Sequence, residues 1–256
     1  MKTFIAFLKK ELTEQLRGGH ILILGILFVL FGIMNPAIAK LTPWMMELLS
    51  DSLAESGMVI TEIPVDALTS WTQFYKNIPM ALIVFVLITC GTLTAECQKG
   101  TLIPVLTKGL SRTKVICAKF VSLALMWSAG YWLCYAVTYG YNAYFWDNSI
   151  AHSLAVPALA YYLFGLWVVT LVMLFSSLSS ASTGVLLGTG GVCLAAYLLS
   201  LIPKLQPYTP MRLTESMSAA TGVLGADALI AAAVITSAFA VVNILASCII
   251  FKKKKL

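Results

Sequence analysis

Charged side chains are scarce in this 256-residue sequence: only 11% of the residues are Asp, Glu, Lys or Arg, whereas 59% are hydrophobic. Soluble domains carry about 25% charged residues, so the composition excludes an ordinary soluble protein and indicates a membrane protein. The net charge of +6 does not favour nucleic-acid binding, because the basic residues lie at the margins of apolar stretches, where they orient membrane helices.

Several motifs that carry chemistry are also absent. The sequence has no phosphate-cradling GxxxxGK[ST] motif, so any ATPase would be a separate subunit and ATP and Mg²⁺ would bind there. We expect no cofactor and no metal in this chain. His20 and His152 lie at expected interfaces, whereas an intramembrane serine protease needs a serine within reach of a histidine at membrane depth. The serine-rich cluster at 176–182 lies at a cytoplasmic turn instead, so we assign no catalytic residue. The six cysteines have no CxxC spacing and no neighbouring histidine, and we expect them to be packing residues: Cys90, Cys97, Cys117, Cys134, Cys193 and Cys248.

Five long stretches without charge set the number of membrane crossings. A spanning helix needs about 20 residues, so the stretch 148–203 is long enough for two, and the serine-rich segment 176–182 supplies the turn between them. The sequence therefore predicts an all-α integral membrane fold, a single domain over 1–256. Its six spans are expected at about 21–39, 77–95, 120–142, 154–176, 184–203 and 228–251.

The segment before the first span, residues 1–19, is predicted to be an amphipathic interfacial helix. Phe4, Leu8, Leu12 and Leu16 recur with a helical period. A cleavable signal peptide is the alternative, because lysines precede the apolar run and Ala-Ile-Ala follows it at 37–39. The acidic residues at 11 and 14 argue against such a leader.

Lys and Arg orient the spans, because they stay on the cytoplasmic side of short connections. With both termini in the cytoplasm, thirteen of the 17 basic residues lie inside and eight of the 11 acidic residues lie outside. The long outer connection 40–76 is expected to hold a short amphipathic helix around Trp44–Leu53. No acidic or basic residue falls within the six spans, and no internal repeat supports an ion-coupled carrier.

Small residues form stripes on the last two spans. Gly184, Gly188 and Gly191 belong to a stripe on the fifth span, and Asn243 belongs to one on the sixth. Such stripes let helix backbones approach closely in lipid. Packing within one chain is the first interpretation, and a dimer or substrate surface is the second. Asn243, like Asn35, should face protein.

The connection between the second and third spans, residues 97–114, is predicted to be structured. Thr101 can cap a short helix, Pro104 fits its first turn and Gly109 can end it. Ser111 can then cap a helix that runs through Lys119 into the third span. Leu102, Ile103, Val105, Leu106 and Leu110 are too apolar to remain in water, so the segment should press on a partner or on the membrane surface.

This connection resembles that of ABC-2 type permeases, the membrane subunits of type-2 ABC exporters. The resemblance is carried by an acidic residue, Lys-Gly-Thr-Leu, a short apolar helix, Ser-Arg and a lysine, and it extends in weaker form over the whole chain. The matching residues are Glu96, Lys99, Gly100, Thr101, Leu102, Leu106, Thr107, Ser111, Arg112 and Lys119. The resemblance implies that this segment is a coupling helix docked on an ATP-binding subunit, and that two permease chains, identical or related, face each other.

The sequence thus favours the permease subunit of an ATP-driven exporter in the plasma membrane, without enzymatic activity of its own. An intramembrane enzyme such as a protease, or a non-transporting immunity or anchor protein, is the alternative. The substrate is not specified by any motif.

Overall fold

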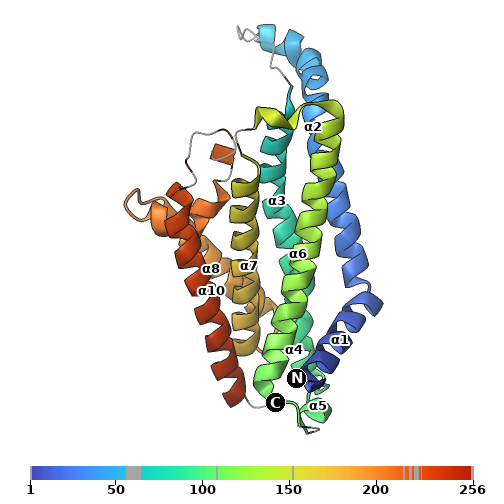
Figure 1. Ribbon diagram of the computed structural model, residues 1–256, viewed down its shortest axis with the longest axis vertical. Helices are drawn as coiled ribbons and strands as arrows, with labels where there is room; N and C mark the ends of the chain where they lie inside the picture. Colours follow the sequence, from blue (N-terminus) through green and yellow to red (C-terminus); the bar gives the residue numbers. More distant parts are fainter. Residues whose placement is uncertain are drawn as a thin grey trace.

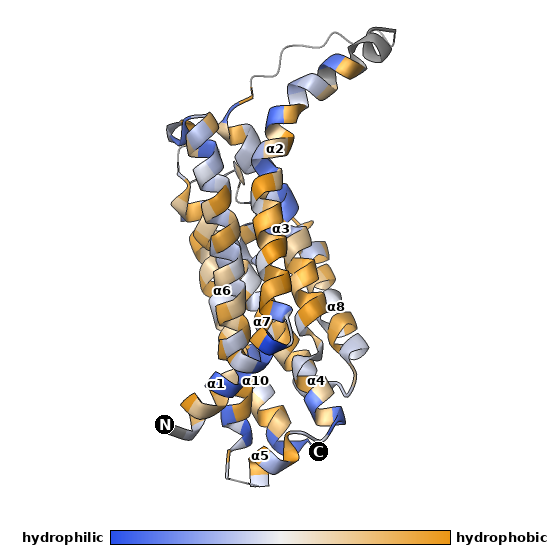
Figure 2. Ribbon diagram, turned by 90° about the vertical axis from the view of Figure 1, so that its right-hand side faces the viewer, coloured by the Kyte–Doolittle hydropathy of each residue, from blue (hydrophilic) through white to orange (hydrophobic). Residues whose placement is uncertain are grey.

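The computed structural model describes residues 2–55, 65–107, 109–151, 153–215, 217–218, 221, 225 and 227–254, and every regular element within them is a helix. Six helical segments are long and apolar enough to cross a membrane, which confirms the predicted fold class. They are His20–Met45, Ala67–Gln98, Arg112–Phe145, Ala155–Leu178, Ser182–Ser200 and Asp227–Lys253. Figure 1 shows these helices side by side in one bundle, and Figure 2 shows hydrophobic residues concentrated along its middle.

The chain begins with α1 (Lys2–Arg17), which turns at Gly18 and Gly19 into α2 (His20–Glu55). The segment Trp44–Leu53, for which a short helix was expected, is helical, but it is the end of α2, which continues without a break beyond the first span (Figure 1). Pro36 and Pro43 lie inside α2. The outer connection is accordingly shorter than predicted, since much of it belongs to this helix.

The second span consists of α3 (Ala67–Thr89) and α4 (Gly91–Gln98), and it begins ten residues before the predicted position 77. Asp66 caps α3 by accepting a hydrogen bond from the Thr69 amide at 2.9 Å. The short α5 (Ile103–Thr107) follows, and then α6 (Arg112–Phe145) runs through the whole third span.

The second half contains α7 (Ala155–Leu178), α8 (Ser182–Ser200) and α10 (Asp227–Lys253). Short 3₁₀ helices lie in the connections: η1 (Asn148–Ile150), η2 (Gln206–Tyr208) and η3 (Pro210–Thr214). Helix α7 is the central element of this half, because both α8 and α10 pack against it.

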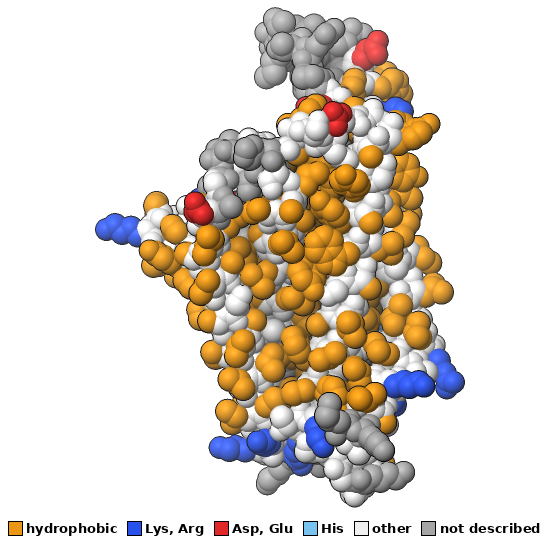
Figure 3. Space-filling model, in the orientation of Figure 1, with side chains coloured by type: hydrophobic (Ala, Val, Ile, Leu, Met, Phe, Trp, Pro, Cys, Tyr) orange, Lys and Arg blue, Asp and Glu red, His pale blue; other side chains and the backbone are white. Residues whose placement is uncertain are grey.

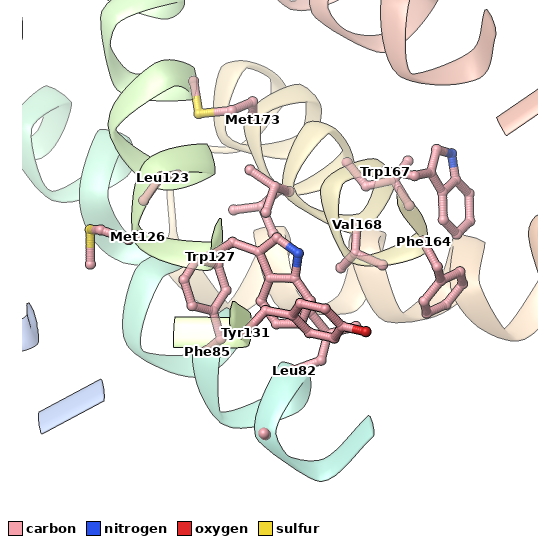
Figure 4. Close-up of a cluster of buried hydrophobic side chains, with 14 of the residues drawn as sticks. Leu82, Phe85, Leu123, Met126, Trp127, Tyr131, Phe164, Trp167, Val168 and Met173 are labelled. Carbon is pink, nitrogen blue, oxygen red and sulfur yellow. The ribbon is translucent and has the colours of Figure 1, made fainter. Parts of the chain in front are cut away.

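Aromatic side chains fill the interior between α3, α6 and α7. Trp127 is fully buried and contacts Phe28 and Phe85 edge-on, with ring centroids 6.0 and 5.6 Å away (Figure 4). Tyr131 stacks on Tyr161 at 6.3 Å. Because aromatic rings bury large areas and pack with defined geometry, this cluster fixes the spacing of the three helices.

Buried polar side chains join helices inside the bundle. Asn35 donates to Thr138 at 3.2 Å and accepts from Asn77 at 3.0 Å, so α2, α6 and α3 are linked at one point. Asn243 of α10 donates to Thr170 of α7 at 3.1 Å. Both asparagines therefore face protein, as predicted, and these contacts satisfy polar groups that lipid could not.

Charge is distributed unequally between the two ends of the bundle. In Figure 3, Lys and Arg gather at the end where α5 lies, whereas the visible acidic side chains lie toward the opposite end. The first and last described residues lie at the basic end (Figure 1). All six cysteines are free thiols.

Candidate partner-docking site

The α4–α5–α6 connection folds back at two glycines with positive φ. Gly100 (φ 66°) follows α4, and Gly109 (φ 91°) follows α5, a backbone conformation that other residues rarely adopt. Thr101 does not cap α5: its amide and its hydroxyl both bond to the Glu96 carbonyl, at 3.2 and 3.4 Å. Ser111 caps α6 by accepting from the Lys114 amide.

The apolar residues of this connection point in two directions. Leu102 and Leu110 are buried in the chain's own core, and Val105 and Leu106 pack partly against it. Ile103 is 47% exposed, and Pro104 and Thr107 are exposed beside it. The surface left for a partner is therefore narrower than predicted, because Leu102 and Leu106 anchor α5 instead of standing free.

A buried ion-pair network holds the connection to α1 and α6. The Lys119 side chain is 1% exposed, and its ammonium nitrogen lies 2.8 Å from Glu11 and 2.7 Å from Glu96. It also donates to the Thr92 carbonyl at 3.2 Å. Glu11 is 1% exposed as well. Three helices (α1, α4 and α6) thus contribute opposite charges to one point, close to where α5 begins.

Lys10 covers this network from α1. Its ammonium group lies 2.8 Å from Glu96 and 3.3 Å from Glu11, and it also pairs with Glu14. Partial burial opposes a charge on Lys10, but the hydrogen bonds to Glu14 and Glu96 outweigh that effect and raise the pKa of its ammonium group above the ordinary value. Lys10 therefore stays charged and neutralises part of the acidic cluster.

The role of Glu11 was not found from the sequence. The apolar period of the N-terminal segment placed Phe4, Leu8, Leu12 and Leu16 on one face, whereas the most buried residues of α1 are Phe7, Glu11 and Gln15. Their spacing of four residues was visible in the sequence, but an acidic residue in such a set normally indicates a solvated face. Only the position of Lys119, 108 residues away, makes its burial favourable.

Arg112 is engaged within the chain, although the sequence suggested a charge available to a partner. Its guanidinium donates to the carbonyl groups of Phe251, Lys252 and Lys254 at the end of α10. Cations stabilise helix C-termini in this way, because the last carbonyl groups lack partners and carry partial negative charge. Arg112 therefore fastens the start of α6 to the end of α10.

A second basic residue closes the end of α7. The Lys254 ammonium group donates to the Ser179 carbonyl at 2.6 Å and to the Ser176 carbonyl at 3.3 Å. Partial burial lowers the pKa of Lys254. Gln98 likewise donates to the Ser180 carbonyl at 2.7 Å. The α7–α8 turn is thus bonded to both α4 and the residue after α10.

Among the residues predicted to meet a partner, Lys99 and Ser111 are exposed, and Glu96 lies inward with the ion pairs. Lys108 and His152 lie outside the described residues. Glu11, Glu14 and Glu96 place carboxylate oxygens within 4.8 Å of one another, as a cation site would. Lys10 and Lys119 already contact these carboxylates, so the arrangement is an ion-pair network.

The predicted small-residue stripe of α8 divides into two environments. A Cβ at Gly188 would lie 2.2 Å from the Phe175 ring, and one at Gly184 would lie 2.2 Å from Ser179 Oγ. These two glycines allow contacts within the chain. Gly191 has no such neighbour within 4 Å, so the part of the stripe around it is open.

One protein-family model, described as "ABC-2 family transporter protein", matches residues 5–256. No curated protein matches the chain. The match covers nearly the whole chain and confirms the resemblance seen in the connection 97–114.

Proposed function

Since the chain belongs to the ABC-2 family of transporter proteins, we propose that it is the permease subunit of an ATP-driven exporter whose ATPase is a separate chain. It is a multi-pass membrane protein with the membrane domain of a transporter. ATP and Mg²⁺ bind to the partner in this proposal, and the permease contributes a pathway and its motion.

The observation that carries the proposal is the contrast within α5. Its inner side is anchored by Leu102 and by the ion pairs next to it, and its outer side presents Ile103 to solvent. An exposed apolar residue on a firmly held short helix suits a docking contact. A mobile loop would absorb a movement of the ATPase, whereas this firmly held connection can transmit that movement to the spans.

The contacts at the basic end suggest how a movement of the ATPase would be transmitted to the other helices. Movement of α5 would pull α4 and α6 directly, α1 through Glu11, and α10 through Arg112. Closure of two ATPase subunits would then shift paired permeases between inward-open and outward-open states. We propose that the second permease chain is a copy or a relative of this one.

The orientation belongs to the same proposal. The basic end of the bundle would face the cytoplasm, because Lys and Arg are retained there, and α5 would then lie where ATP is present. Both termini would be cytoplasmic, and the membrane would be the plasma membrane.

The test is co-purification of the ATPase, co-expressed from its own gene, together with substrate efflux. Ile103→Asp should abolish both, because it places an unpaired charge in the docking contact. Leu178→Asp is the matched control: Leu178 is similarly exposed at the same end of the bundle but lies outside α5. Retention of the ATPase and of efflux by Ile103→Asp at normal expression would refute the proposed docking surface.

A further inference from the structure

A cleft lies among α7, α8 and α10, below the outer segment that carries η2 and η3. Its volume is about 350 Å³, within the usual range for small-molecule sites. Helices α8 and α10 each pack on α7, which forms the inner wall of the cleft, and on the 3₁₀ helices, which form its roof. None of the described residues that line the cleft is charged.

The inner wall holds a largely buried tryptophan whose N–H group makes no hydrogen bond within the described residues. Trp167 is only 3% exposed and lines the cleft, and its Nε1–H makes no hydrogen bond within the described part of the chain. Figure 4 shows its ring away from Trp127 and beside the Phe164 ring, with the two ring centroids 5.7 Å apart. The indole N–H of an otherwise buried tryptophan usually has a partner, so this donor is available to a ligand in the cleft.

Two further polar groups meet the same space. The Asn243 side chain lines the cleft and uses its amide nitrogen to hold Thr170, which leaves its oxygen as a free acceptor. Tyr208, in the roof, is exposed and also lines the cleft. The cleft therefore offers a donor and an acceptor between apolar walls.

We propose that this cleft binds an uncharged amphipathic molecule that enters from the membrane between α8 and α10. Its apolar body would lie between the two helices, and its polar group would accept from Trp167 and donate to Asn243. A phospholipid fits poorly, because its phosphate would meet no cation among the lining residues. That this molecule is the transported substrate rests on the proposed function, whereas its binding in the cleft does not.

The test uses the purified chain without an ATPase and a neutral probe, 1-oleoylglycerol with a diazirine in its acyl chain. Photolabelling should be saturable, should map to α7, α8 and α10, and should exceed labelling by the matching lysophosphatidylglycerol probe. Trp167→Phe and Asn243→Leu should each weaken the apparent affinity about fivefold to tenfold, since each removes one hydrogen bond to the probe; Asn243→Leu also removes the bond to Thr170.

Two matched alanine-to-phenylalanine substitutions separate loss of the binding space from an effect on folding. Ala195 is exposed and lines the cleft, so Ala195→Phe should fill the space and abolish saturable labelling. Ala238→Phe makes the same change at an exposed alanine of α10 outside the lining and should leave labelling intact. Equal labelling of Ala195→Phe and the unmodified chain, or labels spread over all lipid-facing helices, would overturn the proposal. The labelling assay needs no ATPase, so a negative labelling result does not contradict the exporter proposal. Conversely, a variant that no longer docks the ATPase should still be labelled.

Discussion

Replacing Lys119 by methionine should be among the most destabilising single changes at the basic end. Lys119 is buried between Glu11 and Glu96, and its loss leaves two buried carboxylates with only Lys10 to balance them. Breaking a buried ion pair by removing one partner costs about 3–5 kcal/mol. For a chain of this size, each kcal/mol shifts the melting temperature by about 2–4 °C, so Lys119→Met should lower it by about 6–20 °C.

The double variant Lys119→Met/Glu11→Met separates charge balance from packing. It removes one charge of each sign and leaves the Lys10–Glu96 pair, 2.8 Å apart, in place. Replacing a buried pair by apolar side chains is often nearly neutral, so the double variant should recover most of the lost stability. Lys99→Met is the control, because Lys99 is exposed in the same connection.

The assay is thermal unfolding of the purified protein in one detergent at a fixed scan rate, since apparent melting temperatures depend on that rate. A shift below about 2 °C for Lys119→Met would mean that the ion pairs contribute little. A double variant no more stable than Lys119→Met alone would also refute the charge-balance argument, because the loss would then come from packing at residue 119.

Three more outcomes follow from the contacts inside the bundle. Arg112→Glu should expose the end of α10 to trypsin, because a carboxylate would face the carbonyl groups that Arg112 now binds; unchanged cleavage would contradict this. Asn35→Leu should cost about 1–3 kcal/mol, because Asn77 loses the acceptor of its hydrogen bond and Thr138, which still donates to the Gly32 carbonyl, loses a donor. Asn142→Leu should cost nothing in the same unfolding assay, because neither amide atom of the buried Asn142 has a partner in the described chain. Gly188→Leu should reduce the folded yield through its clash with Phe175, so Gly191→Leu is the better test of a dimer. A smaller complex for Gly191→Leu on native mass measurement supports a dimer contact at α8, and an unchanged mass contradicts it.

Composition and apolar run lengths were sufficient to predict the membrane class and the six spans. Those features depend on the match between a run of apolar residues and the thickness of the bilayer, which is a local property of the chain. Ser111 as the cap of the third helix is local in the same sense, because a cap acts within one turn.

The partners of buried polar residues required the tertiary structure. Glu11, Glu96 and Lys119 are far apart in the sequence, and only the packing of α1, α4 and α6 brings their charges together. Arg112 looked free because nothing nearby in the sequence needs it, yet it binds the end of α10. The break of the second span at Cys90 and the continuation of α2 to Glu55 also carried no clear local signal. Apolar patterns specify which segments enter the membrane, whereas the choice among partners for buried charges depends on contacts between distant helices.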